Sequence, residues 1–216
     1  MKNVLAWMGL LVFPAAAVAQ FPEVRAGGRI ASGMTHFTDL AGQNASYTLA
    51  WEAGLAACRQ FSPYFSFETY PAFVAYGSRA KGAIPVDNEN TSGAFYTHEE
   101  SYRIYSLQFP FVFKFYVPLE TMRLHWLAGP DVGLNLSGNS TRRFDNKNVA
   151  GYVNRSMNNL ENVFFSILIG FGTTFETRNG LIMLDYRVRQ GLSPSGYLQH
   201  HKFLANASTI GLTWMY

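Results

Sequence analysis

The sequence predicts an all-β protein: an eight-stranded, antiparallel, up-and-down transmembrane β-barrel. Three observations lead to this prediction. Apolar residues recur at every second position over long segments, which is the period of strands and not of helices. Only 14% of the residues are charged while 16% are aromatic, and an average soluble domain carries roughly 25% charge. Long and short connections alternate along the chain, as they do in a barrel whose strands cross a membrane.

The first twenty residues have the composition of a signal peptide. Lys2 precedes an apolar run at residues 4–13, and the small residues of Ala17-Val18-Ala19 follow, an order typical of a cleaved leader. A run of about ten apolar residues is too short to cross ~30 Å of hydrocarbon as a helix. We therefore expect residues 1–19 to be a signal peptide and residues 20–216 to form an exported barrel domain.

Five expected strands occupy residues 24–37, 47–58, 65–79, 102–117 and 124–136. In each of them, polar residues concentrate on one parity and apolar residues on the other, so one face is apolar and the other is mixed or polar. The contrast is strong in the fourth segment, where the apolar parity is Tyr105, Leu107, Phe109, Phe111, Phe113, Phe115 and Val117.

Three further strands are expected at residues 162–176, 181–190 and 203–216. The alternation is sharpest in the second of these, where apolar Leu184 is followed by Asp185. All eight segments are about ten to fifteen residues long, which is enough for a tilted strand to cross a membrane.

The connections predict an orientation. Residues 59–64, 118–121 and 177–180 are short and rich in turn formers, whereas residues 80–101 and 137–161 are long and polar. Transmembrane barrels have short periplasmic turns and longer external loops, so we expect both termini to be periplasmic. The alternative is a soluble β-sandwich or lipocalin-like barrel, which the leader, the low charge and the loop asymmetry disfavour.

This orientation predicts two belts of aromatic residues at the two membrane surfaces. The expected outer belt is Tyr47, Trp51, Tyr76, Tyr102, Tyr105 and Phe203. The expected inner belt is Phe65, Phe67, Phe115, Tyr116, Trp126, Phe175, Trp214 and Tyr216.

The polar parity predicts a charged lumen. Its cations are Arg25, Arg29, Lys114, Arg187 and Arg189, and its anions are Glu52, Glu68, Asp131 and Asp185. An eight-stranded barrel is just wide enough for its own side chains to fill it. Burying one ion alone costs several kcal/mol, so we expect these groups to pair into a plug. The alternative is a narrow path that makes the protein a small passive pore.

No residue pattern predicts catalysis. A lipid A-modifying barrel enzyme is an alternative, and its candidate groups would be His36 with Ser32 or Asp39, or His200 or His201 with Ser208. A metal would need the loop residues His98, Glu99 and Glu100 to meet His200 and His201. No spacing forces any of these groups together, so we expect no catalytic residue, no cofactor and no metal.

Other binding chemistries lack a signal as well. Cys58 is a single cysteine, which excludes an internal disulfide framework and a cysteine-based zinc site. The net charge of +3 comes without a Lys/Arg cluster, so a nucleic-acid partner is not expected.

The chain ends in a Gly-x-x-aromatic-x-aromatic pattern formed by Gly211, Trp214 and Tyr216. This pattern resembles the signal by which bacterial outer-membrane barrels are recognised by their assembly machinery. A barrel must pair its last strand with its first, because an unpaired strand edge is not tolerated in hydrocarbon. We therefore expect the barrel-assembly machinery to bind the C-terminal strand.

Several short motifs together resemble the PorT-type outer-membrane β-barrel family, which is related in architecture to the OmpA and OmpX barrels. They are residues 24–28, 105–110 with Lys114, 128–133, 170–172 and 184–187. The resemblance implies a location in the bacterial outer membrane, in contact with its lipid. The founding member of the family is linked to a secretion and gliding apparatus.

The expected function is that of a non-enzymatic, integral outer-membrane protein. Its external loops are expected to contact a partner, a surface polymer or an envelope or secretion assembly, because binding tends to lie on loops carried by a rigid scaffold.

Overall fold

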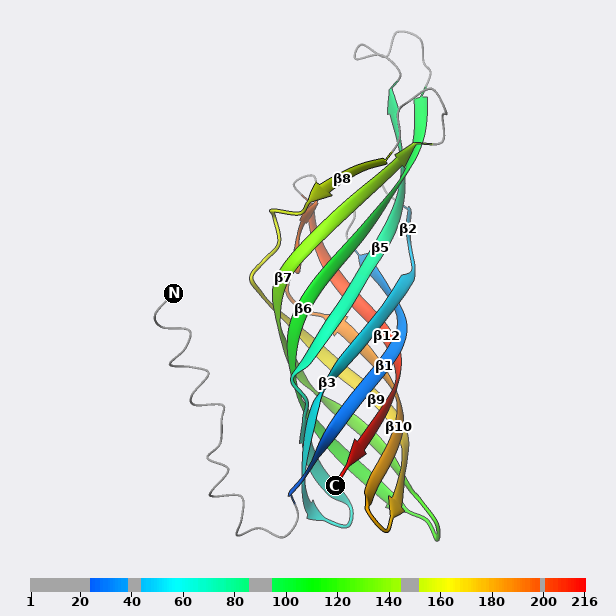
Figure 1. Ribbon diagram of the computed structural model, residues 1–216, viewed down its shortest axis with the longest axis vertical. Coiled ribbons are helices and arrows are strands. Elements are labelled where there is room, and N and C mark those ends of the chain that lie inside the picture. The colour runs from blue at the N-terminus through cyan, green and yellow to red at the C-terminus, as the bar shows by residue number, and fades with distance from the viewer. Residues whose placement is uncertain (1–23, 39–43, 86–94, 145–151, 199–200) are drawn as a thin grey trace, which may run out of the picture.

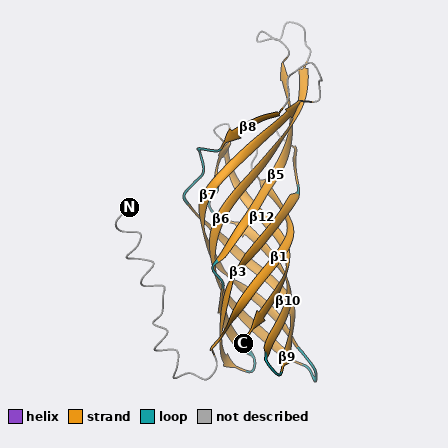
Figure 2. Cartoon of the chain, viewed as in Figure 1, coloured by secondary structure: helices purple, strands orange, loops and turns teal. Residues whose placement is uncertain are grey.

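The computed structural model describes residues 24–38, 44–85, 95–144, 152–198 and 201–216, and the expected signal peptide lies outside them. Strands make up the regular structure of these residues (Figures 1 and 2). The long strands are β1 (Val24–Thr38), β3 (Thr48–Ser62), β5 (Ala72–Pro85), β6 (Phe95–Pro118), β7 (Arg123–Phe144), β9 (Val163–Thr177), β10 (Gly180–Gly191) and β12 (His201–Met215). The short ones are β2 (Asn44–Ser46), β4 (Phe65–Thr69), β8 (Tyr152–Ser156) and β11 (Gly196–Leu198). A search of the described residues finds no helix that could span a membrane.

The strands close into an antiparallel ring. β1 pairs with β3 on one side and with β12 on the other, and β6–β7 pairing completes the circuit. β4 and β5 act as one interrupted strand between β3 and β6, broken at Tyr70 and Pro71. Within the described residues the ring thus has eight strands, and the predicted fold class is confirmed.

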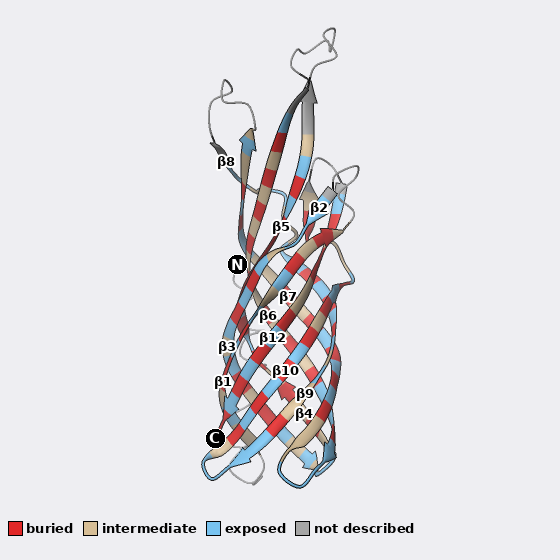
Figure 3. Cartoon of the chain, turned by 90° about the vertical axis from the view of Figure 1, so that its right-hand side faces the viewer, coloured by how far each residue is buried: buried red, intermediate tan, exposed pale blue. Residues whose placement is uncertain are grey.

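Buried and exposed residues alternate along most of the long strands (Figure 3), whereas residues 74–78 of β5 are all buried. On β9, Phe165 and Ile169 are 51% and 53% exposed, whereas Phe164 and Leu168 are 2% and 1% exposed. The exposed residues are large and apolar, and a continuous apolar surface of this kind is typical of a face that contacts lipid. The parities predicted for β6, β9, β10 and β12 agree with this arrangement.

Two predicted loops are partly strand. β5 and β6 stay paired from Ala72↔Gln108 to Pro85↔Phe95, and β6 and β7 stay paired out to His98↔Phe144. Most of residues 80–101 and 137–144 therefore extend the sheet beyond the apolar rows. Alternation does not reveal this extension, because both of its faces are polar and the period-2 signal needs one apolar face.

One predicted turn is shorter than expected. β3 continues to Ser62, so only Pro63 and Tyr64 connect it to β4. The register shifts between Gln60 and Ser62, and a bulge of this kind hides the end of a strand from an alternation pattern.

The aromatic belts are only partly as predicted. Tyr47, Trp51 and Trp126 are exposed on the outer surface. Tyr76, Tyr102, Tyr116 and Phe203 instead point inward and are at most 5% exposed. The prediction was wrong for these four because it used only their distance from the strand ends and ignored their parity, which places them on the lumen side.

Candidate functional site

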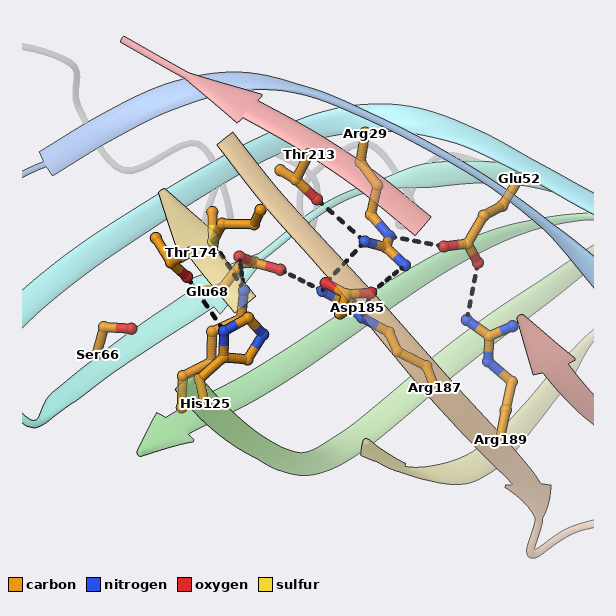
Figure 4. Close-up of polar contacts among 12 residues, drawn as sticks. Arg29, Glu52, Ser66, Glu68, His125, Thr174, Asp185, Arg187, Arg189 and Thr213 are labelled. Carbon is orange, nitrogen blue, oxygen red and sulfur yellow. Dashed lines mark hydrogen bonds and ion pairs between the residues drawn. The ribbon is translucent and has the colours of Figure 1, made fainter. Parts of the chain in front are cut away.

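Eight buried charged side chains form one continuous chain of ion pairs across the lumen. Figure 4 labels six of them: Arg29, Glu52, Glu68, Asp185, Arg187 and Arg189. The two signs alternate along this chain, so every charge except the two end ones has an opposite charge on both sides. The N···O distances are 2.6 Å for Lys114–Glu68, 2.9 Å for Glu68–Arg187, 2.7 Å for Arg187–Asp185, 2.9 Å for Asp185–Arg29, 2.8 Å for Arg29–Glu52, 3.4 Å for Glu52–Arg189 and 2.7 Å for Arg189–Asp131.

The alternation of the strands positions these charges. Asp185, Arg187 and Arg189 occupy every second position on β10 and therefore point to the same side. The remaining five residues come from the inward rows of β1, β3, β4, β6 and β7. Residues far apart in sequence meet because the ring brings all inward rows to one axis.

Arg25 is not part of this network. It lies half-buried at the start of β1, and no ion pair involves it among the residues that the structure describes. The predicted balance of five cations to four anions therefore becomes four to four in the buried chain. A neutral set of fully paired ions is the arrangement in which burial costs least.

Uncharged side chains complete the coordination of the ions. The ring of Tyr70 lies against two guanidinium groups, with Cζ of Arg29 at 5.1 Å and Cζ of Arg187 at 4.6 Å from its centroid. Arg29 also donates to Oγ1 of Thr213 at 3.0 Å, and Oγ of Ser166 donates to Asp131 at 3.0 Å. Tyr70 was not among the predicted site residues. It follows Ser66 and Glu68 at a spacing of two residues, so the strand period places it on the same inward face.

Aromatic residues fill the lumen towards the end of the barrel that carries the extended β5–β6–β7 sheet. Phe37 stacks on Phe203 with ring centroids 4.5 Å apart and contacts Tyr76 and Tyr102 at 6.2 Å and 6.1 Å. Phe164 lies 6.1 Å from Tyr76. Tyr76, Tyr102 and Phe203, which were expected in the outer belt, thus pack around Phe37 inside the lumen.

Asn135 joins two connecting segments to these aromatic residues by hydrogen bonds. Its Nδ2 donates to the backbone oxygens of Glu161 at 2.8 Å and Ser195 at 2.9 Å, and its Oδ1 accepts from Tyr76 Oη at 2.7 Å. Met157 and Leu160 pack against the buried core from the same segment. A cavity of about 520 Å³ lies beside it, and its lining includes Asn159, Leu160, Glu161 and Tyr197.

The candidate catalytic groups do not converge where the structure describes them. His36 contacts the ring of Tyr47 at 4.6 Å, while Ser32 Oγ donates to Ala50 O. Ser208 Oγ donates to Tyr186 Oη at 2.6 Å. Asp39, His200 and the side chain of His201 lie outside the described residues.

The residues that a metal would need do not share one face where the structure describes them. His98 and Glu100 are buried, and Glu100 accepts from Arg142 at 3.0 Å, whereas Glu99 lies on the opposite face beside Arg79. Within the described residues no group of three or more metal-ligating side chains is found. Cys58 is a buried free thiol.

The C-terminal pattern closes the ring. Tyr216 N donates to Ala26 O at 2.9 Å, and Ala26 N donates to Tyr216 O at 3.3 Å. The side chains of Trp214 and Tyr216 are 39% and 75% exposed on the outer surface. Gly211 points inward, where a Cβ atom would lie 2.1 Å from a guanidinium nitrogen of Arg29. Gly211 therefore makes room for the central arginine.

A closed antiparallel ring with an apolar exterior and a paired, polar interior defines a transmembrane β-barrel. The chain belongs to the outer membrane protein beta-barrel domain family, whose model matches residues 19–196. It is thus a bacterial outer-membrane protein. No curated protein sequence matches the chain at a significant level.

Solved structures of outer-membrane barrels resemble the fold at low sequence identity. Ail, the attachment invasion locus protein of Yersinia pestis, is 11% identical over 90% of this chain and 99% of its own, with a TM-score of 0.40. Neisserial surface protein A is 9% identical over 88% and 97%, with a TM-score of 0.43. The outer membrane protease OmpT of Escherichia coli is 14% identical over 91% and 98%, with a TM-score of 0.45.

Proposed function

We propose that the protein is a sealed, non-enzymatic outer-membrane barrel that docks a protein partner of the cell envelope on its external sheet. The observation that carries this proposal is the length of two strands. A transmembrane strand needs about 9–11 residues, whereas β6 has 24 and β7 has 22. About half of each strand therefore lies beyond the hydrocarbon, as a paired and rigid sheet.

The orientation is part of the proposal. The short connections after β3 and β9 and the C-terminus lie at one end of the barrel, and the extended β5–β6–β7 sheet lies at the other (Figure 1). Short turns are characteristic of the periplasmic end. Both termini are then periplasmic, and the sheet projects from the cell surface, where an envelope or secretion assembly or a surface polymer can reach it.

The filled lumen favours docking over transport. Below the aromatic residues, the side chains of Arg29, Glu68, Lys114 and Asp185 are fully buried. A conducting path would have to separate these ion pairs, and leaving a buried ion unpaired costs about 3–5 kcal/mol. In planar bilayers we expect no discrete current steps, and reproducible steps would establish the small pore instead.

A shortened hairpin tests the docking role. Lys81 and Glu99 are directly opposite each other, so residues 82–98 can be replaced by Asn-Gly, which closes a two-residue hairpin. We expect the variant to fold, as judged by the mobility shift of unboiled samples on gels, and to lose the in-cell cross-link to its envelope partner. Retention of the wild-type cross-link by the folded variant would contradict the proposal.

The enzyme alternative has its own readout. We expect the mass of lipid A to stay unchanged when the protein is expressed. A mass change that disappears in His36→Ala or His200→Ala would replace docking by lipid modification.

A further inference from the structure

The outward side of the β5–β6–β7 sheet gathers positive charge just beyond the apolar rows. Arg79 and Lys81 lie on β5, Arg103 on β6 and Arg143 on β7. Glu99 is the anion among the described side chains of this outward cationic face. Four cations and one anion give it a net charge of +3.

The strand register places these residues side by side. Glu99 lies directly opposite Lys81 on one neighbouring strand and Arg143 on the other. Directly opposite residues share a face, with Cβ atoms about 4.5–5.5 Å apart. The Nε atom of Arg79 lies 3.7 Å from Oε1 of Glu99, and their side chains are 57% and 37% exposed. Surface ion pairs as open as this one leave the arginine able to bind another anion.

The outward cationic face continues directly from the membrane-facing surface. Tyr105 is the next outward residue after Arg103 on β6, towards the membrane. Its ring stacks on Phe73 at 5.9 Å, and Phe73 contacts Trp51 at 5.6 Å. Exposed aromatic rings gather at the boundary between hydrocarbon and headgroups. Arg103 is therefore at the level of the lipid headgroups and points sideways, towards lipid. Arg79, opposite Ser101, and Lys81 and Arg143, opposite Glu99, follow it outward on the same face.

We propose that the outward cationic face binds the phosphate groups of outer-leaflet lipid. The inference rests on the orientation given under the proposed function, which makes this end of the barrel external. Arginine binds phosphate through two parallel N–H donors, and lysine adds a compact charge. Clusters of Lys and Arg beside a membrane recognise anionic headgroups through the same charge complementarity.

Native mass spectrometry of the full chain folded in detergent tests the proposal. The probes are lipid A carrying two phosphates and the same lipid with its phosphates removed. We expect the wild type to retain the phosphorylated lipid at least tenfold more tightly. The variant R79Q/K81Q/R103Q/R143Q should lose this preference. The matched control R59Q/R155Q/R178Q/K202Q removes four exposed cations that lie off the face and should keep it.

Each other outcome overturns the proposal. Equal binding of the two lipids by the wild type would exclude phosphate recognition. Equal losses of affinity in the quadruple variant and in the matched control would show that binding depends on total charge and not on this face. If soluble polyphosphate competes with an affinity equal to that of the lipid, the face binds a polyanionic polymer instead of lipid.

If the quadruple variant does not show the gel shift of a folded barrel, R79Q/R103Q is used and should lose at least threefold of the affinity for the phosphorylated lipid. The Asn-Gly hairpin variant keeps all four cations, so it should lose partner docking while lipid binding stays.

Discussion

Arg29 and Asp185, which are 156 residues apart in the sequence, bind each other through two guanidinium–carboxylate contacts of 2.9 Å and 3.1 Å. Their strands, β1 and β10, do not pair with each other, because β12 lies between them. The pair therefore links strands that the backbone hydrogen bonds leave separate. It is the middle link of the buried chain of ion pairs, so a change there leaves charges unpaired on both sides.

Asp185→Asn should destabilise the barrel by about 3–5 kcal/mol, because Arg29 and Arg187 would each lose a buried partner. The measurement is urea unfolding from lipid vesicles, followed by the gel mobility of the folded form. Glu176→Gln is the control, since Glu176 pairs with Arg123 at 2.7 Å but its side chain is 63% exposed. Such a surface pair contributes at most about 1 kcal/mol. Equal effects of the two substitutions would show that the lumen is hydrated and not sealed.

Gly211→Ala and Tyr216→Ala should have different consequences. The alanine methyl group at position 211 would displace the guanidinium of Arg29, which Glu52, Asp185 and Thr213 hold in place. We expect lower stability of the purified barrel. Tyr216→Ala removes an exposed ring and should leave that stability unchanged while slowing assembly in cells, as measured by pulse-chase folding. If Tyr216→Ala assembles at the wild-type rate, the C-terminal pattern is not the signal that the assembly machinery binds.

Asn135→Ala should release the two connecting segments that Asn135 binds at the end of the barrel carrying the extended β5–β6–β7 sheet. The substitution removes three hydrogen bonds to Tyr76, Glu161 and Ser195, and each group left unsatisfied costs about 1–3 kcal/mol. Hydrogen exchange should accelerate in residues 157–162 and 192–197 and not in the barrel strands. Asn154→Ala, which breaks an exposed bond of 2.8 Å to Thr141, should leave exchange in both segments unchanged. Faster exchange throughout the barrel would mean that Asn135 is a general core residue.

Phe111→Arg should cost about 2–4 kcal/mol because Phe111 lies in the middle of the outward row of β6, at the centre of the bilayer. Val117→Arg is on the same row and the same strand but at the C-terminal end of the strand, beside Pro118. An arginine there reaches the headgroups, so the expected cost is about 0–1 kcal/mol. Unfolding of the two variants from vesicles measures the difference. Equal costs would place the membrane elsewhere along the strand.

The sequence predicted the barrel and most of its buried charges for one physical reason. Lipid favours apolar residues in the outward rows, so Asp185 and Arg187 stand out between Leu184, Tyr186 and Val188. The same rule placed Arg29, Glu52 and Lys114 inside, although it could not say which ions touch. Those contacts depend on the register between strands, which a single sequence does not contain.

The errors have physical causes as well. Beyond the membrane both faces of β6 and β7 meet water or polar neighbours, so the alternation fades and the strands were predicted as loops. Tyr76, Tyr102 and Phe203 were assigned to the outer belt from their positions near strand ends, although the lumen needed their volume. The contacts of Asn135 could not be predicted either, because its Nδ2 group binds backbone oxygens of two distant segments, and no side-chain pattern indicates them.

Site-directed spin labelling along residues 105–117 tests the central claim most directly. Single labels in the vesicle-embedded protein report accessibility to oxygen, which concentrates in the bilayer. Labels at odd positions should be oxygen-accessible and labels at even positions shielded, with a period of two throughout the segment. A flat profile, or one in which the even positions are the more accessible, would contradict a sealed barrel whose aromatic row faces lipid.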